Sequence, residues 1–213
     1  MSVRKRVKLL ARGRPISPPL VCPLVVAQAA EIEALPVEEF LADPTMLTKG
    51  LRTLAGALGT DVIVTADGAV VGEAAVEATR RLAATVDDAA IAVALPRPDL
   101  PLARAFLDAG AHLLLLLVVD APLADGREWR EAATTVVNVA RFHQAVPVVV
   151  FADAADAEWA PRGTVVCVPE PGPGQGLALP PDLSGWRIPD GVPIVTTLGP
   201  VQGAFADVRA VLA

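Results

Sequence analysis

Four side chains with chemical potential follow apolar, strand-like stretches of this 213-residue chain. Asp67, Asp120 and Asp153 come at or just after such stretches, and Arg97 lies just beyond another. Carboxylates held together raise one another's proton affinity, so one can stay protonated and act as an acid, or they can jointly favour a cation. An aspartate after a strand can instead cap the next helix or turn. This second interpretation stays open, above all for Asp120 and Asp153.

The elements that must position these residues alternate along the chain. Apolar runs predict strands at 20–27, 61–65, 89–95, 112–119, 147–152, 164–168 and 192–197. Helical periodicity predicts helices after Pro44 and at 73–84, 102–109, 127–144 and 201–212. In the helix after Pro44, Asp43 is the expected cap, and leucines at positions 47, 51, 54 and 58 form one face.

This alternation predicts a parallel sheet, because each helical crossover covers a sheet face and strands buried on both faces become continuously apolar. The number of units is near eight, so we expect a compact (β/α)8 barrel of the TIM type, with an open doubly wound sheet as the competing fold. The chain lacks a GxGxxG turn after an early strand, so a dinucleotide-binding fold has no specific support. In a barrel, Asp67, Arg97, Asp120 and Asp153 would meet at the mouth formed by the carboxyl ends of the strands.

Composition and charge set the domain organisation. With 53% hydrophobic residues the chain can bury one sizeable core, so we expect a basic N-terminal helix or arm over 1–19 and a single barrel domain over 20–213. Six of the 18 basic residues, and none of the 24 acidic ones, lie in 1–14. Such an arm can contact an acidic partner, but the lack of interleaved aromatic residues argues against nucleic acid.

The sequence does not indicate a membrane-spanning protein, a secreted protein or a cysteine-based metal site. The longest apolar run, 113–119, is far shorter than the ~20 residues of a membrane-spanning helix, and prolines interrupt the region where a signal peptide would continue, so we expect a cytoplasmic protein. Cys22 and Cys167 lack metal-site spacing and are expected to be buried thiols.

The region 169–189 is rich in Pro and Gly and is expected to be a loop with at most a short strand near Trp186. Its segment PEPGPGQG over 169–176 could be a ligand lid or a rigid spacer, and it lacks the Lys-Ser/Thr end of a phosphate loop. Trp186 could stack on a flat ligand, although tryptophan is more often simply buried.

The segment 37–75 resembles the uroporphyrinogen decarboxylase superfamily, which includes porphyrinogen decarboxylases and cobamide-dependent methyltransferases. The resemblance lies in an Asp-Pro helix start, Gly-Thr-Asp before an apolar strand, and Asp67 followed by Glu73-Ala74; LDAGAHLLLLLVVDAP adds a looser likeness. It implies a parallel barrel acting on a small organic molecule by decarboxylase-type or methyl-transfer chemistry. It also implies that Asp67 is the catalytic residue. In the decarboxylases the matching aspartate binds pyrrole nitrogens and stabilises the cation formed on protonation.

The departures from that superfamily concern ligand groups. VVAQAAEIEALP has no arginine where the decarboxylases hold propionates, and the chain has no tyrosine. Phe151-Ala152-Asp153 stands where the methyltransferases have zinc-binding His-x-Cys. We therefore expect no zinc or nucleotide motif and leave the cofactor unknown, with Arg97, Asp120, Asp153 and Trp186 as candidate substrate-binding residues. A non-catalytic barrel that acts as a partner-binding or accessory subunit is the alternative. The partners expected are a small-molecule ligand and either a partner subunit or a second copy in a homodimer.

Overall fold

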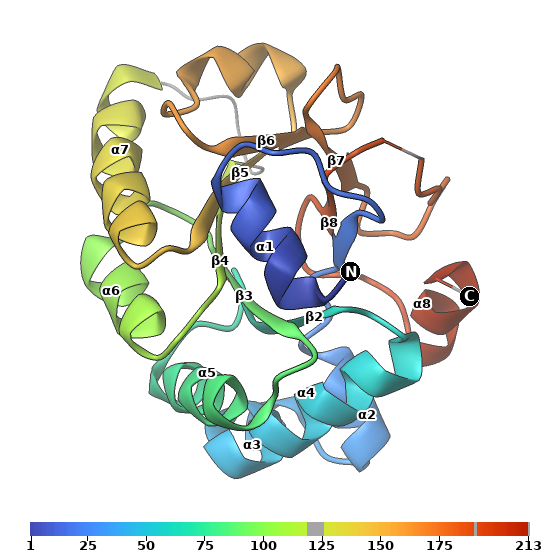
Figure 1. Cartoon of the computed structure of the whole chain (residues 1–213). Coiled ribbons are helices and arrows are strands. Elements are labelled where there is room, and N and C mark those ends of the chain that lie inside the picture. The colour runs from blue at the N-terminus through green and yellow to red at the C-terminus, as the bar shows by residue number, and fades with distance from the viewer. Residues whose placement is uncertain (119–125, 190, 213) are drawn as a thin grey trace.

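The computed structural model describes residues 1–118, 126–189 and 191–212, and in them a parallel sheet is wrapped by helices (Figure 1). The strands are β1 (Leu20–Cys22), β2 (Val62–Asp67), β3 (Ala90–Leu95), β4 (Leu113–Val118), β5 (Val146–Phe151), β6 (Val165–Val168), β7 (Gly176–Leu179) and β8 (Ile194–Thr197). The helices are α1 (Val3–Ala11), α2 (Gln28–Glu33), α3 (Val37–Ala42), α4 (Pro44–Leu58), α5 (Glu73–Thr85), α6 (Leu100–Asp108), α7 (Gly126–Phe142), the 3-10 helix η1 (Ala154–Trp159) and α8 (Phe205–Leu212).

The eight strands pair in the order β1-β8-β7-β6-β5-β4-β3-β2, and β1 also lies against β2, so the sheet nearly closes into a barrel. The predicted barrel is thereby confirmed over the open sheet. Every residue of β3, β4 and β5 is buried, because one face of each strand looks into the lumen and the other meets helices. None of the described helices has the length and apolar character needed to cross a membrane.

Strand register separates two layers of core. Ala94, Leu115 and Val148 lie side by side on neighbouring strands and face the lumen. Val93 and Leu114, which alternate with them, pack outward in a cluster with side chains of α6 and α7. Side chains alternate along a strand, so the apolar runs of the sequence fill both layers at once.

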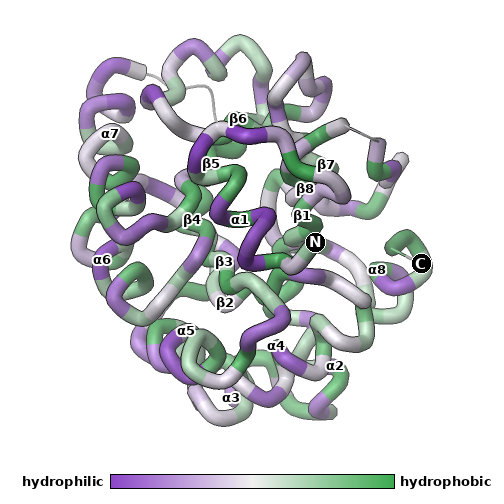
Figure 2. The backbone as a smooth tube through the Cα atoms, in the orientation of Figure 1, coloured by the Kyte–Doolittle hydropathy of each residue, from purple (hydrophilic) through white to green (hydrophobic). Residues whose placement is uncertain are grey.

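The predicted helix after Pro44 is α4, and it has the expected cap. Asp43 Oδ1 accepts the N–H of Thr45 at 2.7 Å, and Gly59 ends the helix in the left-handed region at φ 66°. The leucines at 47, 51, 54 and 58 are all buried. Figure 2 shows hydrophobic and hydrophilic stretches alternating along such helices, as one buried stripe requires.

Some boundaries and elements differ from the prediction. Strand β1 ends at Cys22 rather than near residue 27; Pro23, which has no N–H for a sheet ladder, follows it. A strand, β7, occupies 176–179, in the region expected to be loop, and it precedes Trp186 rather than containing it. It was missed because four residues next to a Gly- and Pro-rich segment show too little periodicity to mark a strand.

Helix α1 lies across the amino end of the barrel, which faces the viewer in Figure 1. Val3, Val7 and Leu10 are buried, although the helix is largely hydrophilic in Figure 2. Arg4 Nη2 donates to the Val86 carbonyl, just before β3, at 2.7 Å. Arg6 binds the segments that lead into β1 and β2. The basic helix therefore lies over part of this end of the barrel and is held there by its arginines.

Candidate functional site

Asp67 is the last residue of β2, and a bulge decides which way it faces. Val64 lies beside Ala92 of β3, but Ala66 rather than Thr65 lies beside the next residue, Val93. Thr65 is therefore the extra residue of a β-bulge, a feature that re-aims the side chains after it.

Both residues at the bulge face outward toward α5. Thr65 Oγ1 shares a hydrogen bond of 2.6 Å with Thr79 Oγ1, and Ala66 packs in the same cluster as Ala75. Asp67 then lies beside Ala94, on the lumen side. Simple alternation would have turned Asp67 toward the helices, so the bulge places this carboxylate inside the barrel.

The Asp67 carboxyl is enclosed, with 1% of the residue exposed. Burial raises its pKa, although the backbone N–H groups of Val70, Ala69 and Val26 act in the opposite direction; the Val70 N–H donates to Oδ1 at 2.9 Å. A carboxyl with a raised pKa keeps its proton to higher pH and can donate a hydrogen bond. A Cβ built on Gly68 would lie 2.8 Å from Leu117 Cδ1, so Leu117 packs tightly against this turn.

The other predicted mouth residues differ from Asp67 in exposure. Arg97 follows β3 and Asp153 follows β5, so both lie at the carboxyl end of the barrel, but both are exposed. Asp153 Oδ1 accepts the N–H of Ala155 at 2.8 Å and caps η1, which is the capping interpretation left open for it. Asp120 lies outside the described residues. Among the described candidates, only Asp67 is buried at the lumen.

Trp186 lies apart from Asp67, on the outer face of β7 and β8. No described helix separates β7 from β8, and Trp186 packs against the cluster that includes Leu179 and Val195. Its Nε1–H donates to the Pro180 carbonyl at 2.8 Å. The ring thus covers sheet that a helix would cover elsewhere in the barrel, and ligand stacking by Trp186 stays a prediction.

Buried polar groups that the sequence did not single out tie β1 and its following helix to β8. Thr196 Oγ1 donates to the Cys22 carbonyl at 2.9 Å, and Gln28 Nε2 donates to the carbonyls of Val201 at 2.9 Å and Gly203 at 2.8 Å. Burial raises the pKa of the Cys22 thiol to about 12, which makes it an inert core group.

No cluster of three or more His, Cys, Asp and Glu side chains suited to a metal ion occurs within the described ranges.

A cavity of about 650 Å³ lies at the opposite, amino end of the barrel, and Arg12, Arg14 and Arg141 are among the residues lining it. None of the predicted site residues that the structure describes lines it. The available signal was the basic run at 1–14, which indicated a charged arm; nothing local in the sequence showed that Arg141, far along the chain, would join it.

No protein-family model matches the chain, and no curated protein matches it by sequence. Among solved structures it is similar to a methyltransferase from Methanosarcina mazei, with 10% identity, a TM-score of 0.69, and coverage of 100% of this chain and 97% of that one. It is also similar to 3-keto-L-gulonate-6-phosphate decarboxylase from Vibrio cholerae, with 12% identity, a TM-score of 0.51, and coverage of 80% and 92% respectively. N-acetylneuraminate lyase from Fusobacterium nucleatum shares 10% identity at a TM-score of 0.50, over 73% of this chain and 64% of that one. At these identities the likenesses show the fold, a parallel α/β barrel.

Proposed function

We propose that this barrel acts on a small organic molecule at its carboxyl-end mouth, by decarboxylase-type or methyl-transfer chemistry, with Asp67 as the catalytic residue. The observation that carries the proposal is the bulge in β2, which turns Asp67 from the helix layer into the lumen. Ligands of such barrels bind at this end, where residues from several strand ends converge.

The environment of Asp67 suits an acid. Burial raises the pKa of its carboxyl, and a proton held there can be donated to substrate carbon or nitrogen as charge develops. Loss of carbon dioxide leaves a carbanion-like centre that needs such a proton. The resemblance of segment 37–75 to the uroporphyrinogen decarboxylase superfamily supports a catalytic role for Asp67, although the matching aspartate of the decarboxylases stabilises the cation formed on protonation rather than donating the proton.

The test uses one probe for each type of chemistry. Pyrrole-2-carboxylate, followed by release of carbon dioxide, probes decarboxylation; methylcobalamin, followed by its absorbance with a thiol acceptor, probes methyl transfer. Asp67→Asn keeps the shape and an acceptor oxygen but lacks the acidic proton, so we expect turnover of the active probe to fall by about 100-fold or more.

The matched control is Asp43→Asn, because Asp43 is a half-buried carboxylate that caps α4 and asparagine caps equally well. This variant should retain wild-type turnover. Equal turnover by wild type and Asp67→Asn would contradict the proposed role of Asp67.

A non-catalytic barrel that binds a partner subunit is the second candidate, and the near-complete burial of Asp67 favours it. A substrate can reach this carboxyl only if some of the groups that cover it shift. The accessory role predicts that a stoichiometric partner copurifies with the chain and that neither probe raises the melting temperature. Stabilisation by a probe that depends on Asp67 would favour the enzyme.

A further inference from the structure

The amino end of the barrel is only partly covered by α1. Arg4 and Arg6 fix this helix to the segments leading into β1, β2 and β3. The chain after α1 then passes in front of β6 and β7 before it enters β1 (Figure 1). The cavity of about 650 Å³ lies beneath this segment, against the starts of β5, β6 and β8. Its volume falls within the range of small-molecule sites, ~300–1,000 Å³.

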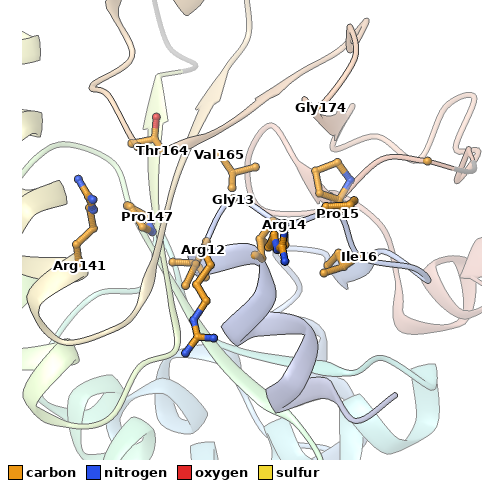
Figure 3. A pocket seen from close by; sticks show the side chains of 16 residues that line it. Arg12, Gly13, Arg14, Pro15, Ile16, Arg141, Pro147, Thr164, Val165 and Gly174 are labelled. Carbon is orange, nitrogen blue, oxygen red and sulfur yellow. The ribbon is translucent and has the colours of Figure 1, made fainter.

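Three arginine residues line this cavity, and its described lining includes no acidic side chain. Arg12 and Arg14 come from the segment after α1, and Arg141 from the last turn of α7, on the far side (Figure 3). None of the three makes an ion pair with a described residue. In a chain with a formal net charge of −6, this is a local concentration of unpaired positive charge.

Two glycines help to place the three arginines that line the cavity. Gly13 closes α1 with its N–H bonded to the Leu10 carbonyl at 2.9 Å and φ at 65°, which places Arg12 and Arg14 on either side of a tight turn. Gly163, with φ at 83°, lies under Arg141: a Cβ there would be 3.1 Å from Nη1. Glycine at 163 therefore lets the guanidinium pack against the turn before β6.

The remaining wall is largely apolar. Ile16, Pro147 and Val165 line the cavity, and Figure 3 shows Pro147 and Val165 between Arg141 and the segment that carries Arg14. A ligand that fits must have an anionic group for the guanidinium donors and an apolar body for this wall. Guanidinium groups match phosphate and carboxylate oxygens with paired N–H donors.

We propose that this cavity binds a small organic anion, whose phosphate or carboxylate is held by Arg14 and Arg141 and whose apolar body contacts Ile16, Pro147 and Val165. The site lies at the end of the barrel opposite Asp67. It is therefore distinct from the proposed catalytic mouth and does not depend on it.

The test is isothermal titration calorimetry of the full chain with three probes of similar size: phenyl phosphate, benzoate and neutral benzamide. Both anions should bind, and benzamide should not. The tighter of the two anions identifies the natural head group as phosphate or carboxylate. Binding should weaken as sodium chloride rises from about 50 to about 500 mM, because the guanidinium groups are exposed to screening.

Variants locate the site. Arg14→Gln and Arg141→Gln should each weaken anion binding about tenfold, the effect of losing one charge-assisted contact. Arg209→Gln is the matched control, since it removes an exposed charge on α8 and should leave affinity unchanged. Asp67→Asn should also bind normally, which separates this site from the catalytic proposal.

Absence of anion binding at millimolar concentration would overturn the proposal. So would equal binding of benzamide, or an equal loss of affinity in Arg209→Gln and Arg141→Gln. Circular dichroism melting of each variant shows whether a loss of binding comes from unfolding, and an unchanged melting temperature assigns the loss to the site.

Discussion

Replacing Arg6 by methionine tests whether α1 is an integral part of the barrel. Arg6 is 3% exposed; it donates to the carbonyls of Pro18 at 3.2 Å and Pro19 at 3.1 Å, and it forms an ion pair with Asp61. Methionine keeps the apolar stem but leaves both carbonyls without this donor. Hydrogen bonds to a charged group contribute ~1.5–3 kcal/mol each, whereas the ion pair contributes less because the Asp61 side chain is 42% exposed.

Removing a buried guanidinium also relieves its desolvation penalty, so the expected net loss is about 2–3 kcal/mol in the free energy of unfolding. In a chain of this size such a loss lowers the melting temperature by roughly 5–10 °C. Urea unfolding followed by circular dichroism measures it. Arg12→Met, on the exposed chain just after α1, is the control and should stay within about 0.5 kcal/mol of wild type. An Arg6→Met protein as stable as wild type would refute this expectation, because relief of the guanidinium's desolvation penalty would then fully offset the lost hydrogen bonds.

Three further perturbations test the core and the mouth. Burial raises the pKa of Asp67 in the folded protein, so the folded protein loses stability as pH rises above the unfolded-state pKa of ~3.9 and through the raised pKa. Asp67→Asn removes this titration, so its free energy of unfolding, measured with urea, should increase relative to that of wild type from pH 3 to pH 7. A difference between the two proteins that stays constant with pH would contradict this. Gly176→Ala should destabilise by about 1–3 kcal/mol, because the new Cβ would lie 2.5 Å from Cys167 Sγ and 2.9 Å from the Ile194 carbonyl; adding Cys167→Ala should restore part of the melting temperature. Trp186→Phe should cost about 1 kcal/mol through loss of the bond to the Pro180 carbonyl, and an unchanged denaturation midpoint would show that this bond contributes nothing.

The class of fold was readable from local patterns. Strands such as 113–118 are buried on both faces and therefore continuously apolar, and α4 carries its cap and its leucine face in consecutive residues. These signals depend on neighbours in the chain, so periodicity detects them. Strand β7 escaped because its place in the barrel depends on pairing with β6 and β8 rather than on its own four residues.

The candidate site depended on tertiary structure. The sequence indicated that Asp67 comes at the end of a strand, but alternation alone would have turned it toward the helices; the bulge at Thr65 depends on pairing with β3 and on the contact with Thr79. The cavity at the amino end of the barrel likewise brings together Arg12 and Arg14, near the start of the chain, and Arg141, far along it. Residue types and strand order are local properties that the sequence carries, whereas the direction of a side chain and the meeting of distant charges arise only when strands pair and the barrel closes.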